Sequence, residues 1–343
     1  MVLDNVLKVG PNNISNIFKI LEEKNIGGKI LFITDQNVNK LYGSKVKYQL
    51  EQLGKVKMEF INYNSIKYSM LMAEKIIATD IDYVVGLGGG KVLDVGKYSA
   101  YIAKKPFISI PTTMANDGIA SPIAVLKRED NRPKSLGCRM PYIIIVDTSL
   151  IMSSPVNLIR AGIGDTISNY MALMDWKFAC ENNKDNMNDF AYLMSKMAFD
   201  SMLKTEYKEI SIGFIDVLAN SLILSGLAMN FAGSSRPVSG SEHLFSHALD
   251  YYCGSTNLHG IQVALGTVSM LKLLNVDLKP IIDYLNRFGV DVNPRSLSIT
   301  KEDFVLCMQK ASSMRAERYT YLNEVDLEKT KLEKLYDDLL EEL

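Results

Sequence analysis

The first 150 residues alternate between short apolar, β-rich runs and longer stretches with helical periodicity. Five runs carry this pattern, at residues 29–35, 55–61, 82–89, 107–111 and 142–147. The alternation predicts parallel strands joined by helices that cover both faces of one sheet. The segment 143–146 (IIIV) is apolar at every position, as expected for a strand buried on both sides. We therefore predict a doubly wound α/β domain over residues 1–150.

The pattern changes after residue 150, where the β-rich runs stop and helical periodicity continues to the charged, amphipathic segment 324–343. Pro155 follows a pair of serines and is suited to open the first helix of a new domain. The apolar stretch 217–232 is interrupted by polar residues and is shorter than the roughly 20 apolar residues of a membrane span. We interpret it as a buried core helix, so residues 151–343 are predicted to form an all-α domain.

Composition narrows the classes of protein that fit. With 343 residues, of which 47% are apolar and 22% charged, the chain can bury two ordinary cores. The 38 Lys and Arg residues against 39 Asp and Glu leave no positive excess for nucleic acid or an anionic membrane surface. The four cysteines form no CxxC pair, and the N-terminus MVLDNVLKVG lacks the pattern of a signal peptide. We expect a cytoplasmic protein that neither spans a membrane nor binds nucleic acid.

A glycine-rich turn at residues 84–91 (VVGLGGGK) follows one predicted strand and leads directly into a helix. Glycine allows close approach of the backbone to a pyrophosphate, and the N-terminal end of the helix stabilises its negative charge. The spacing is not GxGxxG, and the turn follows a middle strand, so it is not a standard Rossmann fingerprint. The alternative is a tight strand-to-helix turn that binds nothing.

All three histidines of the chain, His243, His247 and His259, lie in the segment 241–260. His243 and His247 share one helix face, and His259 follows a loop that contains Gly254. Such a cluster favours a metal site completed by a carboxylate, and the glycine-flanked Asp165 is the strongest candidate. The alternatives are ordinary buried histidines and, for Asp165, a helix N-cap.

Five segments, at 88–97, 109–122, 161–169, 234–250 and 258–266, occur in the order and approximate spacing of one known superfamily. The chain resembles the iron-containing alcohol dehydrogenases, glycerol dehydrogenases and dehydroquinate synthases, most closely the sn-glycerol-1-phosphate dehydrogenase branch. The resemblance spans most of the chain. It implies a dehydroquinate synthase-like fold, one NADPH or NADH, and one divalent metal, zinc before iron or nickel.

The resemblance also assigns roles to residues. The metal ligands that it implies are Asp165, His243 and His259. The dinucleotide contacts that it implies are Asp35, Gly88, Gly89, Gly90, Lys91, Val92, Asp94, Thr112, Thr113 and Ser121. Asp117, Asp165 and His247 are implied to contact the substrate, with Asp117 and His247 taking part in catalysis. An acid at Asp35 favours NAD over NADP, whereas this branch often accepts or prefers NADP, so the cofactor preference stays open.

The activity implied is the reversible reduction of dihydroxyacetone phosphate to sn-glycerol 1-phosphate, the backbone of archaeal-type phospholipids. The metal is expected to polarise the ketone, and His247 or a metal-held water chain to supply the proton. For the substrate phosphate we predict Arg236, whose alternative role is a salt bridge. A homo-oligomer is expected. Glycerol dehydrogenase, a dehydroquinate synthase-like lyase and a catalytically inactive metal-binding protein stay open as alternatives.

Overall fold

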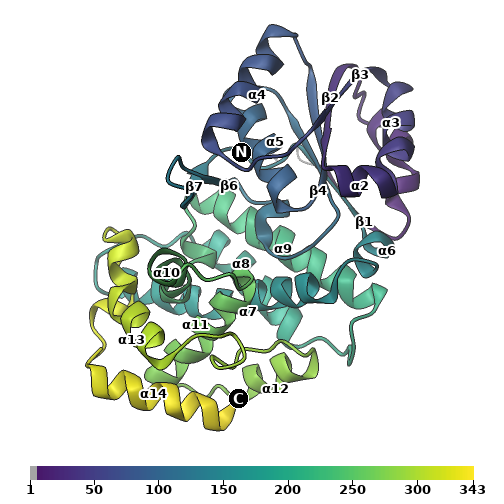
Figure 1. Ribbon diagram of the computed structural model, residues 1–343. Helices are drawn as coiled ribbons and strands as arrows, with labels where there is room; N and C mark the ends of the chain where they lie inside the picture. The colour runs from purple at the N-terminus through teal and green to yellow at the C-terminus, as the bar shows by residue number, and fades with distance from the viewer. Residues whose placement is uncertain (1–5) are drawn as a thin grey trace. The chain divides into compact units, whose positions relative to one another are not determined.

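The computed structural model describes residues 6–343, which divide into two compact units, one that ends at Val156 and one over Asn157–Leu343 (Figure 1). Residues 1–5, part of the N-terminal segment predicted not to be a signal peptide, lie outside the described residues. The domain boundary predicted after residue 150 falls inside helix α6 (Thr148–Met152), which packs against strands of the first unit.

A six-stranded parallel sheet forms the centre of the N-terminal unit. Its strands are β1 (Val6–Gly10), β2 (Gly28–Thr34), β3 (Gly54–Phe60), β4 (Tyr83–Gly88), β5 (Phe107–Pro111) and β8 (Ile143–Asp147), in the order β1-β8-β5-β4-β2-β3. All five predicted strands are confirmed. Every residue of β5 and β8 is buried because helices cover both faces of the sheet. The chain progresses outward from β2 to β3 and then returns to β4, so a topological switch point lies between β2 and β4. Ligands of such sheets bind at the carboxyl ends of the strands at this point.

Short helices connect these strands. They are α1 (Ile17–Glu22), α2 (Gln36–Val38), α3 (Ser44–Glu51), α4 (Ile66–Ala78), α5 (Gly90–Ile102) and α6, with the single turns η1 (Asn13–Ser15), η2 (Asn39–Gly43) and η3 (Asp117–Ile119). The structure adds β1 and the antiparallel hairpin β6 (Ile123–Lys127) and β7 (Pro133–Gly137) to the predicted elements. The hairpin escaped prediction because β7 is mostly polar and has no buried face, which leaves no apolar alternation to detect.

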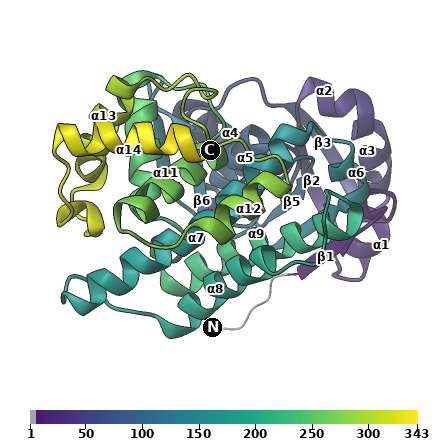
Figure 2. The same ribbon diagram turned by 90° about the horizontal axis from the view of Figure 1, so that it is seen from below.

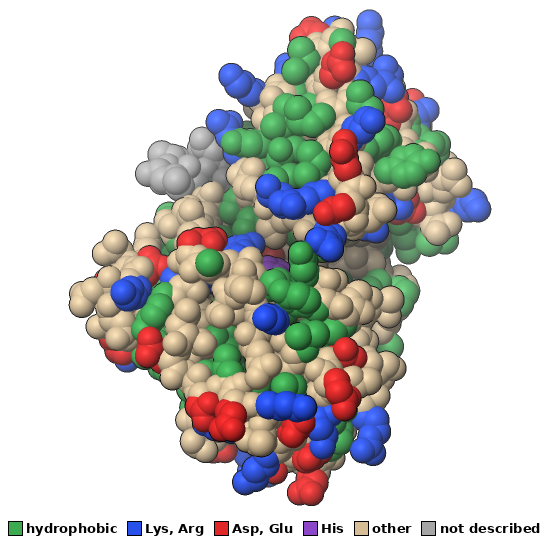
Figure 3. Space-filling model, turned by 60° about the vertical axis from the view of Figure 1, so that its left-hand side comes forward, with side chains coloured by type: hydrophobic (Ala, Val, Ile, Leu, Met, Phe, Trp, Pro, Cys, Tyr) green, Lys and Arg blue, Asp and Glu red, His purple; other side chains and the backbone are tan. Residues whose placement is uncertain are grey.

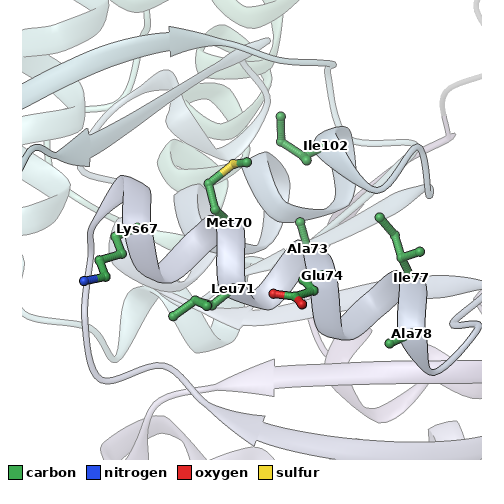
Figure 4. Close-up of a pocket in the computed structure, with 8 residues that line it drawn as sticks. All are labelled: Lys67, Met70, Leu71, Ala73, Glu74, Ile77, Ala78 and Ile102. Atoms are coloured by element: carbon green, nitrogen blue, oxygen red, sulfur yellow. The ribbon is translucent and has the colours of Figure 1, made fainter.

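Helix α4 carries apolar side chains that the described residues leave exposed. Met70, Leu71 and Ile77 are 46%, 56% and 59% exposed, and with Ile102 of α5 they line a shallow pocket (Figure 4). Figure 3 shows apolar side chains gathered on this unit. A surface of this kind is typical of a protein–protein contact.

The C-terminal unit is entirely helical in its described residues. Its α-helices are α7 (Val156–Glu181), α8 (Asp189–Leu203), α9 (Ile212–Ala232), α10 (Ser241–Ala248), α11 (His259–Leu273), α12 (Lys279–Arg287), α13 (Lys301–Lys310) and α14 (Lys329–Glu342). Single turns complete it: η4 (Arg236–Val238), η5 (Leu249–Cys253), η6 (Ala311–Arg315) and η7 (Tyr321–Asn323). The predicted terminal amphipathic helix is α14, which packs on α11 and α13 (Figure 2).

Helix α9 contains the stretch predicted to be a core helix. By length and composition it is the one helix in the described chain that could cross a membrane. However, 67% of its most apolar window is buried within the protein, and it packs along α8. These features agree with the interpretation as a core helix.

Two glycines bring α7 and α11 into backbone contact. A Cβ at Gly260 would overlap the carbonyl of Ala161, and a Cβ at Gly164 would overlap the carbonyl of Gly260. The glycines are therefore required for the close crossing of the two helices. Since Asp165 and His259 adjoin these glycines, the crossing places the two side chains next to each other.

Candidate metal centre and cofactor turn

Three side chains from three helices converge in the C-terminal unit. Asp165 of α7, His243 of α10 and His259 of α11 each offer one ligand atom, and these atoms lie within 4.8 Å of one another. The separation of His259 Nε2 and Asp165 Oδ1 is 3.8 Å. Ligands about 2.1 Å from one tetrahedral ion lie about 3.4 Å apart, so small side-chain adjustments suffice to close this site on a metal. Asp165 lies in the interior of α7, which rules out the N-cap role that the sequence left open.

Hydrogen bonds orient both imidazoles. His243 Nδ1 lies 2.7 Å from Glu242 Oε1, and His259 Nδ1 lies 3.2 Å from Ser246 Oγ. The Ser246 hydroxyl donates to Gln262 Oε1 at 2.5 Å, which leaves its oxygen free to accept the His259 Nδ1–H. Each ring thereby carries its proton on Nδ1 and presents the Nε2 lone pair. A metal-binding histidine characteristically donates its second ring N–H in this way.

Burial keeps these histidines uncharged. It lowers the pKa of His243 to about 3, with contributions from the charges of Arg318 and Arg315. The pKa of His259 is lowered to about 3 by burial and by His243. Neutral imidazole is the form that binds metal, so the donor set fits a divalent cation of the zinc, iron or nickel type.

His247 lies beside the cluster without belonging to it. Its ring centroid is 6.4 Å from those of His243 and His259, whose own rings are 4.9 Å apart. Burial, followed by the two neighbouring histidines, holds the pKa of His247 well below its usual value. A neutral imidazole next to the metal ligands can both donate and accept a proton.

A buried acid pair supports α10 and was not predicted. Asp175 Oδ2 accepts the N–H of Ser241 at 2.6 Å, and Glu242 Oε1 accepts the N–H of Gly240 at 2.8 Å. Burial raises the pKa of each carboxyl to about 7, and for Asp175 the nearby Glu242 adds to this. Carboxylates at a helix N-terminus are stabilised by the helix dipole. In the sequence these acids look like ordinary surface residues, because only the tertiary fold buries them.

Arg236 already has partners within its own unit. Its Nε lies 2.5 Å from Asp185 Oδ2, and its Nη1 donates to the carbonyl of Tyr319 at 2.7 Å. The residue is 7% exposed. Of the two roles left open for Arg236, the salt bridge is the one that these contacts support.

In the N-terminal unit, the glycine-rich turn joins β4 to α5 at the switch point of the sheet. Gly89 is the N-cap of α5. Because glycine has no side chain, the first N–H groups of the helix are accessible to a ligand. A Cβ at Gly88 would lie 2.7 Å from Val92 Cβ, so packing alone requires glycine there. A Cβ at Gly90 would meet nothing within 4 Å, so this glycine borders open space. Lys91, next in the chain, is exposed.

Two threonines line the same turn. Thr112 donates its N–H to the carbonyl of Gly88 at 3.0 Å. Thr113 Oγ1 would lie 3.2 Å from a Cβ at Gly89. The segment after β5 thus extends the wall of the glycine turn, where the sequence expected a cofactor contact.

A buried lysine connects the remaining predicted residues of this unit. Lys97 Nζ lies 3.8 Å from Asp94 Oδ1 and donates to the carbonyls of Gly118 and Ser121. Burial raises the pKa of Asp94 and of Asp117 to about 6, against the opposing effect of Lys97. Asp117 is hydrogen-bonded to the Ser121 side chain. Lys97 received no role from the sequence, although its i,i+3 spacing from Asp94 within an apolar helix was a signal of a buried pair.

Asp35 has a structural function as the N-cap of α2. Its Oδ1 accepts the N–H groups of Asn37 and Val38 at 2.9 and 3.0 Å. It follows β2 on the other side of the switch point.

A basic pocket lies in the same unit, and Lys67, Lys91, Lys127 and Arg128 contribute to its lining.

Comparisons with known proteins agree with this arrangement. A family model described as iron-containing alcohol dehydrogenase matches residues 8–155. The glycerol-1-phosphate dehydrogenase (NAD(P)+) of Metallosphaera sedula is 35% identical over 96% of this chain and 94% of its own length. That of Hyperthermus butylicus is 37% identical over 95% and 94%. A probable glycerol dehydrogenase from Sinorhizobium meliloti 1021 has the same fold, with a TM-score of 0.78 and 19% identity over 98% of this chain and 96% of its own.

Proposed function

Since this chain belongs to the glycerol-1-phosphate dehydrogenase family, we propose that it reduces dihydroxyacetone phosphate to sn-glycerol 1-phosphate with NADPH or NADH. The product is the glycerophosphate backbone of archaeal-type phospholipids. The observation that carries the proposal is the convergence of Asp165, His243 and His259, in a chain that matches these relatives over nearly its full length.

Asp165, His243 and His259 are the residues that would hold the divalent metal. We propose zinc, because two imidazoles and one carboxylate form a catalytic zinc donor set that leaves a fourth position open. When bound, the ion supplies a Lewis acid that polarises the substrate carbonyl. Glu242 and Ser246 hold the two imidazoles in the tautomer that this requires.

His247 is proposed to relay the proton that the reduced carbonyl oxygen gains. Because the pKa of His247 is lowered, its imidazole is neutral at neutral pH. The ring would therefore donate the proton of one nitrogen to the reduced carbonyl oxygen while its other nitrogen accepts a proton. Asp117 and Asp165 are proposed to contact the substrate. Asp117 has a pKa of about 6 and can donate or accept a hydrogen bond near neutral pH.

The glycine turn is proposed to bind the pyrophosphate of the dinucleotide, which supplies the hydride. Gly88, Gly89 and Gly90 allow the approach, and Lys91, Val92 and Asp94 follow them in the first turns of α5. The walls of the site are proposed to include Thr112, Thr113 and Ser121. We propose that this unit accepts either cofactor, because Asp35 suits a ribose hydroxyl and the basic pocket around Arg128 suits a 2′-phosphate.

The protein is further proposed to be a cytoplasmic homo-oligomer. The exposed apolar face of α4 supports self-association. All four cysteines are free thiols, including Cys253 and Cys307 whose sulfurs are 3.4 Å apart, which suits a reducing compartment.

The decisive experiment compares two ketones with the purified protein. NADPH and NADH oxidation would be followed with dihydroxyacetone phosphate and with dihydroxyacetone. We expect a much higher kcat/KM for the phosphorylated ketone. A preference for dihydroxyacetone would contradict the proposed substrate and leave the metal site unaffected, because the two ketones share the carbonyl and differ in the phosphate.

A further inference from the structure

Two arginines of the C-terminal unit converge on one hydroxyl group. Arg318 Nη2 donates to Ser235 Oγ at 2.8 Å, and Arg315 Nη1 lies 3.4 Å from the same oxygen. Arg318 also donates through Nη1 to the carbonyl of Ser239. The two guanidinium groups therefore lie near each other, and their like charges repel, so a negative group bound to both would be stabilised.

This arginine pair lies next to the candidate metal centre. Arg315 ends η6, and η6 packs directly against α10, the helix of His243 and His247. The positive charges of both arginines depress the pKa of both histidines, which reflects this proximity. The arginine pair and the metal ligands therefore face a common region of the same unit.

Within the described residues, neither arginine of the pair forms a salt bridge. In the described part of the chain, no carboxylate oxygen lies within 4.0 Å of Arg315 or Arg318, whereas Arg236 has Asp185. Glu242 and Glu317 act on Arg318 electrostatically, and Glu317 also acts on Arg315, but Glu242 is already engaged with Gly240 and His243. Arg318 is only 8% exposed. Burial and the neighbouring arginines lower its pKa to about 10, so the site is short of negative charge.

We infer that Arg315 and Arg318 bind the phosphate group of the substrate, a phosphomonoester dianion. This inference rests in part on the proposed function, because it assigns the phosphate of that substrate. Two planar guanidinium groups offer several N–H donors in the geometry that phosphate oxygens accept, and a dianion would balance the charge of the pair. The sequence predicted that Arg236 binds the substrate phosphate, and we now assign that role to Arg315 and Arg318.

The test uses Arg315→Gln in the metal-loaded, full-length protein. Arg315 makes a single long hydrogen bond to Ser235, so its loss should leave the fold intact. Removal of a charge-assisted phosphate contact should raise KM for dihydroxyacetone phosphate about tenfold to hundredfold. The kinetics with unphosphorylated dihydroxyacetone should change less than about twofold, because that ketone never makes the contact. Arg287→Gln, at the end of α12, is the matched control and should alter neither value.

A second measurement is independent of activity. Inorganic phosphate should raise the melting temperature of the wild type above that in potassium chloride of equal ionic strength, and Arg315→Gln should lose this increase. If Arg315→Gln is unstable, Arg318→Lys is the second variant, because it keeps the positive charge but removes the planar guanidinium group. It should also raise KM for dihydroxyacetone phosphate and not for dihydroxyacetone. Equal changes for both ketones, or undiminished phosphate stabilisation in the variant, would overturn the inference. If the wild type does not reduce dihydroxyacetone phosphate but phosphate still stabilises it through Arg315, the proposed function fails and the anion site stands.

Discussion

The hydrogen-bond chain behind His259 gives the sharpest test of the metal centre. His259 Nδ1–H has Ser246 Oγ as its acceptor at 3.2 Å, and the hydroxyl is fixed by Gln262 Oε1 at 2.5 Å. Gln262 is fixed in turn by Asp250 Oδ1 at 3.1 Å. The substitution Ser246→Ala removes the acceptor, so the imidazole is free to rotate and to carry its proton on Nε2, where it cannot bind a metal.

Loss of such a supporting contact lowers metal affinity about tenfold to hundredfold, equivalent to about 1.4–2.7 kcal/mol. We expect this loss for zinc in Ser246→Ala, measured by competition with a chromophoric chelator near neutral pH. Ser269→Ala is the matched control, because Ser269 is also buried and its hydroxyl bonds only the carbonyl of Leu265 within α11. Wild-type zinc affinity in Ser246→Ala would refute the reasoning, and an equal loss in both variants would show that any buried serine change loosens the site.

Three further predictions follow from the geometry. His243→Ala or His259→Ala should remove the ion and abolish turnover, because two ligands do not retain a divalent cation in an open site; stoichiometric metal with full activity in either variant would contradict the assignment. Gly90→Val should weaken NADPH binding in a fluorescence titration without lowering the melting temperature, since a Cβ there meets only open space. The control Gly137→Val, in the exposed hairpin, should leave the NADPH affinity unchanged. Unaltered NADPH affinity in Gly90→Val would show that the turn is not part of the cofactor site. Burial holds the pKa of His247 in the folded protein well below its unfolded value of about 6.5. As the pH falls below about 6.5, the unfolded chain takes up a proton at His247 that the folded protein does not. The free energy of unfolding therefore has its full value above that pH and decreases as the pH falls. Urea unfolding of metal-free protein at pH 7 and pH 5 should therefore show a smaller loss in the free energy of unfolding in His247→Gln than in the wild type, and parallel pH profiles would exclude this effect.

The local pattern of apolar and polar residues was sufficient to predict most strands of the sheet and the helical half of the chain. The five strands of the sheet were visible because parallel strands such as β8 are apolar throughout, and the helical half was visible from its periodicity. The hairpin β6–β7 and the short edge strand β1 were missed, since neither carries a buried apolar run of the usual length.

The metal ligands were suggested by local clustering for the histidines, and by its glycine-flanked position and then the family resemblance for Asp165. The sequence could not show why the acid is near the histidines, which depends on the glycine-mediated crossing of α7 and α11. It also left Asp165 with an N-cap alternative that its position inside a 26-residue helix removes.

The sequence by itself predicted the two-part architecture, the glycine turn between a strand and a helix, and the cluster of histidines with Asp165 as its carboxylate, because these depend on residue type and near-neighbour spacing. Only the tertiary structure decided which groups are buried and which charges are paired. It gave Arg236 a carboxylate partner and left Arg315 and Arg318 without one, although all three are single arginines in a mixed-charge sequence. The physical reason is that desolvation and charge pairing depend on distances between segments some 80 residues apart along the chain, such as Ser235 and Arg318, and no local pattern encodes those distances.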